Sequence, residues 1–155
     1  LNSGIITSCH ATGSVRAGSD YIGGLVGTNH LGSITFSYAT GSVHGNEFIG
    51  GLVGWNYSGS ITSCYAIGST INGSHLGGLV GWNYYSSTIT LCYAIVSVYG
   101  DGHIGGLVSA NSGSITSCYA AGSVNGDFYI AGGFARGCVV GEVGFHVKSP
   151  DFLYT

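Results

Sequence analysis

The stretch of sequence that decides the fold runs from Ile49 to His75 and reads I-G-G-L-V-G-W-N-Y-S-G-S-I-T-S-C-Y-A-I-G-S-T-I-N-G-S-H. Apolar residues that favour β-structure come in three short bursts, residues 49–53, 61–66 and 70–71, and Gly, Asn and Ser separate them. Short bursts with turn residues between them predict strands. No segment carries a 3.6-residue period long enough for a helix, so we expect the unit to be all-β.

The same unit recurs along the chain at a constant spacing. Pairs of adjacent glycines lie 27, 27, 28 and 27 residues apart, and an asparagine column keeps the same period. The glycine pairs begin at Gly23, Gly50, Gly77, Gly105 and Gly132, and the asparagines are Asn2, Asn29, Asn56, Asn83 and Asn111. A unit of this size cannot bury a core alone, whereas stacked units can, with parallel strands about 4.8 Å apart. We therefore expect residues 1–133 to form a parallel β-helix, or solenoid, of about five coils with a 27–28-residue repeat.

Composition limits the classes of function that the chain can have. Only 6% of its 155 residues are charged, 45% are hydrophobic, and the formal net charge is −3. A core can therefore form, and nucleic acid is not an expected partner because a basic surface is lacking. No apolar run approaches the roughly 18 residues of a membrane span, and Leu1 already lies in repeat phase, so we expect neither a span nor a signal peptide. Scarce Lys and abundant Tyr, Ser and Thr favour an extracellular or cell-surface location.

Three segments of the repeat share the pattern Gly-Leu-Val-Gly, at residues 24–27, 51–54 and 78–81. They resemble the GLUG motif, a short repeat of bacterial surface proteins that include adhesin-like proteins and some IgA-cleaving metallopeptidases. The fourth copy ends in Ser109, and the fifth, at residues 133–136, departs almost entirely. Because the motif carries no known catalytic residue, the resemblance implies a surface location and a scaffold or adhesive role, without peptidase activity.

The invariant columns of the repeat have structural interpretations. Glycine at a strand corner permits positive φ and a close approach of backbones. An asparagine at the same turn of every coil can hold a left-handed conformation and bond to its own backbone. Stacked amides can also bond to one another along the axis. We therefore expect the asparagine column to be a structural ladder.

The chain lacks the usual sequence signatures of an enzyme or a metal site. It contains no H-E-x-x-H, G-x-S-x-G or P-loop motif, so we expect no catalytic residue and no cofactor. His75 and His103 hold equivalent places before the glycine pair, but no third metal ligand accompanies them, and we interpret them as members of an aromatic column. One acidic residue precedes most of the glycine pairs, which supplies too few oxygens for Ca²⁺. No metal is expected.

Four of the five cysteines share one column, in which Ser37 takes the remaining place: Cys9, Cys64, Cys92 and Cys118. This pattern predicts a small buried position that accepts Cys or Ser, rather than a disulfide framework or a metal site. Ile61 and Cys64 are three residues apart, so a bend or bulge must lie between them if both are buried. Leu52 and Val53 are adjacent, so one of the two is expected to face outward and to favour lateral packing.

Two outward surfaces are candidates for binding. The Ile of each Ser/Thr-Ile-Thr triplet should point inward, which leaves two columns of hydroxyls outside: Ser33, Thr35, Ser60, Thr62, Thr88, Thr90, Ser114 and Thr116. This array resembles the face of β-solenoid ice-binding proteins, although Ile5 interrupts it, and the alternative is an ordinary polar strand face. Aromatic residues flank two of the asparagines: Trp55, Tyr57, Trp82, Tyr84 and Tyr85. Their rings can stack on surface glycans or a partner subunit, or on one another as shielding turn residues.

The two ends of the repeat array differ. Residues 134–155 lose the repeat, and we expect them to cap the last coil or to join it to another subunit. The first coil carries no cap in its sequence, and an open strand edge is a template for another chain. The favoured function is therefore a non-enzymatic structural or adhesive surface scaffold that associates with itself end to end, as a fibre or as the stalk of a larger surface protein. Two alternatives remain: a module that binds ice or a glycan, and an accessory repeat region of a larger surface peptidase.

Overall fold

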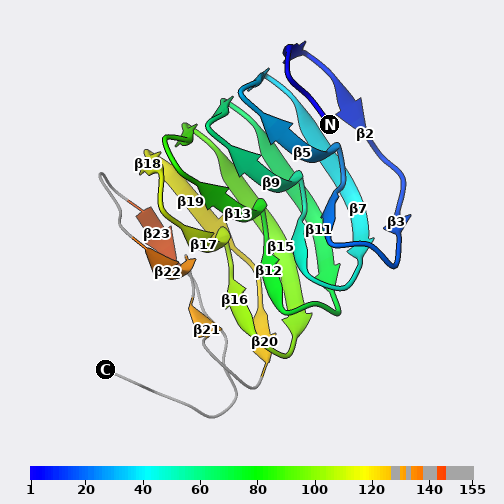
Figure 1. The fold of residues 1–155 in the computed structure, drawn as a ribbon. Helices are drawn as coiled ribbons and strands as arrows, with labels where there is room; N and C mark the ends of the chain where they lie inside the picture. The colour runs from blue at the N-terminus through cyan, green and yellow to red at the C-terminus, as the bar shows by residue number, and fades with distance from the viewer. Residues whose placement is uncertain (127–129, 132–133, 138–142, 146–155) are drawn as a thin grey trace.

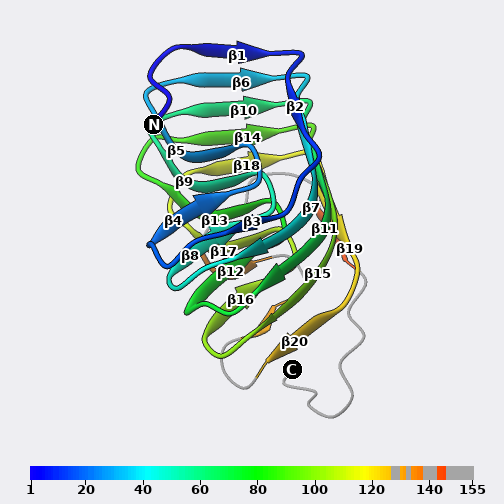
Figure 2. The ribbon, with the colours of Figure 1, turned by 90° about the vertical axis from the view of Figure 1, so that its right-hand side faces the viewer.

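The computed structural model describes residues 1–126, 130–131, 134–137 and 143–145, with side chains for residues 1–126. Every regular element within these residues is a strand, and the chain winds into a parallel β-solenoid (Figure 1, Figure 2). Each coil passes through four sheets, and every sheet runs along the axis of the stack. The expected all-β solenoid of about five coils with a repeat of about 27 residues is confirmed.

The first and second sheets lie consecutively along each coil, and Figure 2 shows the first as a regular ladder of short arrows. The first sheet holds the triplets, in β1 (Ile5–Thr7), β6 (Ser33–Thr35), β10 (Ser60–Thr62), β14 (Thr88–Thr90) and β18 (Ser114–Thr116). The second holds β2 (His10–Ala11), β3 (Val15–Arg16), β7 (Tyr38–His44), β11 (Tyr65–Ile71), β15 (Tyr93–Gly100), β19 (Cys118–Ala121), β20 (Val124–Gly126) and β23 (Val143–Phe145).

The third and fourth sheets complete each coil. The third holds β4 (Tyr21–Gly23), β8 (Phe48–Gly50), β12 (His75–Gly77), β16 (His103–Gly105) and β21 (Ile130–Ala131). The fourth holds β5 (Val26–His30), β9 (Val53–Tyr57), β13 (Val80–Tyr84), β17 (Val108–Asn111) and β22 (Phe134–Gly137). Strands β22 and β23 pair with β17 and β19, so these parts of the expected tail add to the last coil, while the other tail residues lie outside those described.

The parallel register places like residues directly above one another, which builds the core as a set of apolar columns. In the first sheet Ile61 pairs with Ile34 on one side and with Ile89 on the other, and all three side chains are fully buried. The third sheet contributes a matching column through Ile49 and Leu76. Since every coil adds the same inward side chains, burial of the core depends on neighbouring coils and not on any one coil.

A left-handed residue turns the chain between the first and second sheets. Ser63 has a φ of 54° and lies between Ile61 and Cys64, which are both fully inaccessible to solvent. The expected bend between these two buried residues is therefore present. The same place in the other coils also has positive φ, at Ser8, Phe36, Leu91 and Ser117.

The expectation that Leu52 or Val53 faces outward is wrong, because both side chains are fully buried. The strand β8 ends at Gly50 and β9 begins at Val53, so the chain turns a corner between them. Strict alternation of side chains holds along one strand and does not carry across a corner. Both residues of this pair contribute to the core, and the equivalent pairs at residues 79–80 and 107–108 are also fully buried, whereas Leu25 of the first coil is half-buried.

The glycine pairs are explained by close backbone approach and not by positive φ. Among the described glycines, positive φ occurs at Gly41, Gly68 and Gly122, which lie outside the pairs. A Cβ at Gly50 would collide with the backbone oxygen of Val53, and a Cβ at Gly51 would collide with the backbone oxygen of Gly78 in the next coil. The expectation of positive φ at these corners is thus wrong, while the expected close approach is observed.

Candidate functional site

The five asparagines form a continuous amide ladder through one corner of the solenoid. Each Nδ2 donates to the Oδ1 of the next coil: Asn2 to Asn29 at 2.7 Å, Asn29 to Asn56 at 2.8 Å, Asn56 to Asn83 at 2.8 Å and Asn83 to Asn111 at 2.7 Å. The second Nδ2 hydrogen reaches a turn carbonyl, as in the bond from Asn56 to Gly59 O at 3.2 Å. Three of the five are fully buried: Asn29, Asn56 and Asn83.

The ladder asparagines do not adopt the left-handed conformation that the sequence suggested for them. Positive φ falls two residues later, at Leu31, Ser58 and Tyr85. Four of the asparagines lie in strands and Asn2 forms an isolated bridge to Asn29, which lets their amides stack in register with the backbone. The column thus supplies hydrogen bonds to a turn that another residue makes.

A second ladder, of thiols and one hydroxyl, satisfies backbone groups at the corner after the first sheet. The Cys92 Sγ accepts from the backbone N–H of Cys64 at 3.4 Å and donates to the carbonyl of Thr90 at 3.1 Å. Ser37 holds the same place, since its Oγ accepts from the Cys9 N–H at 3.1 Å and donates to the Thr35 carbonyl at 2.8 Å. The position therefore needs a small side chain that both donates and accepts, which explains why Cys and Ser share it.

The four cysteines that the structure describes are free thiols: Cys9, Cys64, Cys92 and Cys118. The neighbouring sulfur of Cys118, then that of Cys64 and burial, raise the pKa of the Cys92 thiol. Cys92 therefore stays protonated and acts as a hydrogen-bond donor, in contrast to a reactive thiolate. Cys138 lies outside the described residues.

The hydroxyl columns lie on the outside of the first sheet, where alternation places them. The Ile residues between them are buried, and the hydroxyl residues are half-buried or exposed: Ser33, Thr35, Ser60, Thr62, Thr88, Thr90, Ser114 and Thr116. The parallel register aligns Ile5 with Ser33, so the first coil interrupts one column, while Thr7 continues the other. The Thr35 Oγ1 donates to the Thr7 Oγ1 at 3.0 Å, so part of the hydroxyl capacity is used within the sheet.

The aromatic residues beside the asparagines stack mostly on one another and on the third sheet. Trp55 and Trp82 lie 5.9 Å apart between ring centroids, and Tyr57 and Tyr84 lie 5.8 Å apart. All four are half-buried, whereas Tyr85 is 62% exposed. Each strand buries its asparagine and leaves the flanking rings half-buried on the other face, so the rings form an aromatic surface.

His75 and His103 belong to the aromatic column of the third sheet, as their positions in the repeat indicated. Their rings stack at 4.9 Å, and His75 stacks on Phe48 at 4.5 Å. Burial, and to a lesser degree the neighbouring His103, lower the pKa of His75. The His75 imidazole is therefore held in its neutral form, and its Nδ1 lies 3.1 Å from the Ser74 hydroxyl.

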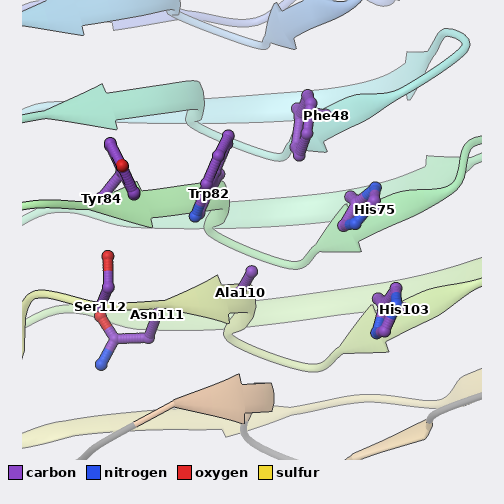
Figure 3. A pocket seen from close by; sticks show the side chains of 8 residues that line it. All are labelled: Phe48, His75, Trp82, Tyr84, His103, Ala110, Asn111 and Ser112. Carbon is purple, nitrogen blue, oxygen red and sulfur yellow. The ribbon is translucent and has the colours of Figure 1, made fainter.

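The aromatic surface ends at a hollow, which Figure 3 shows from close by. The hollow has a volume of about 350 Å³, and residues of strands β8, β12, β13, β16 and β17 and of the turn after β17 surround it: Phe48, His75, Trp82, Tyr84, His103, Ala110, Asn111 and Ser112. It brings together two of the aromatics for which both a partner-facing and a structural role were considered, Trp82 and Tyr84, with the histidines of the third sheet. The other three, Trp55, Tyr57 and Tyr85, do not line it.

Sequence reasoning missed both this hollow and a further aromatic column. One tyrosine in each of the second to fifth coils, followed directly by an alanine, stacks along the second sheet. The Tyr38–Tyr65, Tyr65–Tyr93 and Tyr93–Tyr119 centroids lie 4.7, 4.9 and 5.1 Å apart. The repeated Tyr-Ala pair was a usable signal for that stack. For the hollow, the signal was the loss of Trp and Tyr from their columns at Ala110 and Ser112.

The described part of the chain contains no group of three or more His, Cys, Asp or Glu side chains placed to hold a metal ion. Nor does it contain a helix of the length and apolarity needed to cross a membrane. Its ordered polar groups are the asparagine and cysteine ladders on the inside, and its outer surface carries the aromatic and hydroxyl columns.

The fold and its ladders define a repeat scaffold, a parallel β-solenoid whose coils are held in register by stacked side chains. The family model described as "The GLUG motif" matches residues 45–72 and 72–99, so two consecutive coils at the centre of the chain are GLUG repeats and the resemblance is confirmed there. Comparison with curated proteins and with solved structures gives no match.

Proposed function

We propose that the chain is a non-enzymatic structural segment of an extracellular or cell-surface protein, serving as a rigid stalk or as the repeating unit of a fibre. The observation that carries this proposal is the continuous amide ladder, in which each coil supplies the hydrogen-bond partner of the next. Such a ladder favours the addition of coils along one axis, because each added coil satisfies the amide of the coil before it. The family resemblance supports the surface location, because GLUG repeats occur in bacterial surface proteins.

Axial extension is favoured by the edges of the sheets at the first coil. Within the described residues, strands β1, β2, β4 and β5 pair only with strands of the second coil. The other edges of β1, β2 and β4 carry unpaired backbone N–H and C=O groups, which are a template for a further coil, whether of the same chain or of another copy. Asn2 partly covers the edge of β5, since its N–H donates to the Thr28 carbonyl and its carbonyl accepts from the His30 N–H. Charge does not oppose such stacking, because only 6% of the residues are charged.

A head-to-tail contact joins unlike surfaces, so it propagates into a filament unless its rotation closes a ring. We place residues 134–155 at or near the joint. Light scattering and negative-stain microscopy of the intact chain should reveal end-to-end assemblies, and deletion of residues 134–155 should change the assembly state. An intact chain that stays strictly monomeric at high concentration, with its tail folded over its own last coil, would contradict the fibre and leave the tail as a cap.

A further inference from the structure

The hollow beside Trp82 lies where two aromatic columns lose their rings. The parallel register of the fourth sheet aligns Trp55 with Trp82, and Trp82 with Ala110. The residue after the ladder asparagine changes in the same coil from Tyr84 to Ser112. Two large rings are thus replaced by a methyl and a hydroxymethyl group on one coil, and the backbone continues in register beneath them.

The stacking pattern on the preceding coils shows what the hollow can hold. Each indole lies against the third-sheet ring of the coil before it, with Tyr21 and Trp55 centroids 4.8 Å apart at an interplanar angle of 21°. Phe48 and Trp82 repeat the contact at 4.9 Å and 18°. The next ring in this series would stand over Ala110, between Trp82 and His75. A six-membered ring that enters from solution could therefore stack in the place that an indole occupies on the preceding coils.

The walls of the hollow combine an apolar platform with uncharged polar groups. Trp82 and Phe48 supply apolar ring surface, and Tyr84 and Ser112 supply hydroxyl groups. His75 and His103 supply imidazoles, and the lowered pKa of His75 keeps that ring neutral and able to accept a hydrogen bond. Among the lining residues within residues 1–126, none is an Asp, Glu, Lys or Arg. On the next coil the backbone of Arg136 pairs with that of Ala110, and a guanidinium also donates hydrogen bonds to hydroxyl groups. The chemistry suits a neutral molecule with one apolar face and hydroxyl groups around its edge.

We propose that this hollow is a binding subsite for a neutral pyranose unit of a glycan, which stacks its C–H face on Trp82 and directs its hydroxyls to Tyr84, Ser112 and the histidines. An aromatic ring face against an apolar ligand face contributes modest energy, so one subsite is weak, with a dissociation constant of roughly millimolar order. A scaffold with such a subsite gains affinity when several copies are presented together, as in a fibre or on a cell surface.

The test uses the intact chain and a panel of neutral probes: the methyl glycosides of glucose, galactose and mannose, and N-acetylglucosamine. Binding is followed by tryptophan fluorescence. The key variant is Ala110→Trp, which restores the missing indole and fills the hollow. Its matched control is Thr28→Trp, which adds an indole at the opposite end of the same column, where Thr28 pairs with Trp55. The two variants carry the same number of tryptophans, and circular dichroism verifies that each is folded.

We expect at least one sugar of the panel to change the fluorescence of the native chain saturably. Ala110→Trp should lower its affinity by about tenfold or more, and Thr28→Trp should leave it unchanged within about twofold. If Ala110→Trp does not fold, Ser112→Tyr is the second filling variant, with the same expected loss. The proposal is overturned if no sugar binds, if the filled variants bind as well as the native chain, or if free indole binds where every sugar fails, since the occupant is then an aromatic side chain.

Discussion

At the scale of single residues, the buried polar side chains fall into two groups. The ladder asparagines bond to one another along the column, and Asn56 makes two bonds to its neighbours there and one to the Gly59 carbonyl. Three other buried polar atoms within residues 1–126 have no hydrogen-bond partner: Trp55 Nε1, Thr70 Oγ1 and Ser87 Oγ. A satisfied buried group holds one register of the coils, whereas an unsatisfied one only lowers stability.

Asn56→Ala should lower the free energy of unfolding by about 1–3 kcal/mol. The substitution removes three hydrogen bonds and leaves the Asn29 amide N–H and the Asn83 Oδ1 without their partners in a buried column. The measurement is chemical denaturation, with Asn125→Ala on the exposed side of β20 as the control. A change within about 0.5 kcal/mol, equal to that of the control, would count against a structural ladder.

Thr70→Val should raise the free energy of unfolding by about 1–2 kcal/mol. Thr70 is fully buried, its hydroxyl is unpaired, and the register aligns it with Val43 and Val98, so the column already accepts Val on both sides. The reverse change, Val98→Thr, should lower stability by a similar amount in the same denaturation experiment. A Thr70→Val protein that is less stable than the native chain would mean that the hydroxyl has a partner.

At the scale of the elements, the positions of the short strands depend on the corners that connect them. Each three-residue strand of the first sheet is followed by a left-handed residue and by a side chain that satisfies the turning backbone. Ser63 makes the turn after β10, and the Cys64 N–H that follows it donates to the Cys92 Sγ of the next coil. The thiol column thus links the corner of one coil to that of its neighbour.

Cys92 should be replaceable by Ser and not by Ala. Serine keeps a group that accepts from the Cys64 N–H and donates to the Thr90 carbonyl, as Ser37 does in its own coil, so we expect a loss of less than about 1 kcal/mol. Alanine removes that group and should cost about 1–3 kcal/mol. Thermal denaturation distinguishes the two, with Cys9→Ala at the exposed end of the column as control. Equal losses for the two Cys92 variants would show that volume alone matters there.

At the scale of the whole molecule, stability is a sum over coils and over the contacts between adjacent coils. The coils stack along one axis (Figure 1). Side-chain ladders and stacked rings join each coil to its neighbours, and equivalent residues pair in successive coils. Coils are therefore exchangeable units, provided that an inserted or deleted segment is a full repeat.

Deletion of residues 45–71 should give a folded protein with one coil fewer. The register aligns Ile71 with His44, so joining His44 to Asn72 leaves every column continuous. The denaturant m-value should fall by about one fifth, because it scales with the surface exposed on unfolding. Deletion of residues 45–58 is the matched control, since it breaks the register and should abolish folding. A full-coil deletion that also fails to fold, judged by circular dichroism, would contradict the independence of the coils.

The sequence by itself determined the repeat, the all-β class, the parallel stacking and the inward Ile of each triplet. The repeat and the stacking follow from the constant spacing of equivalent residues, such as Ile34, Ile61 and Ile89. The inward direction of each Ile follows from the alternation of side chains within its own strand. The stacking of the asparagine amides could be anticipated for the same reason, because residues at equal positions in successive coils must meet.

Only the tertiary structure decided what happens at the corners and between neighbouring sheets. Leu52 and Val53 are both buried because the chain bends between β8 and β9, and alternation has no meaning across a bend. The hollow depends on residues of two sheets, since His75 lies in the third and Ala110 in the fourth. The angle at which one sheet meets the next results from closure of the entire coil, so no spacing within the sequence encodes which side chains of neighbouring sheets will face one another.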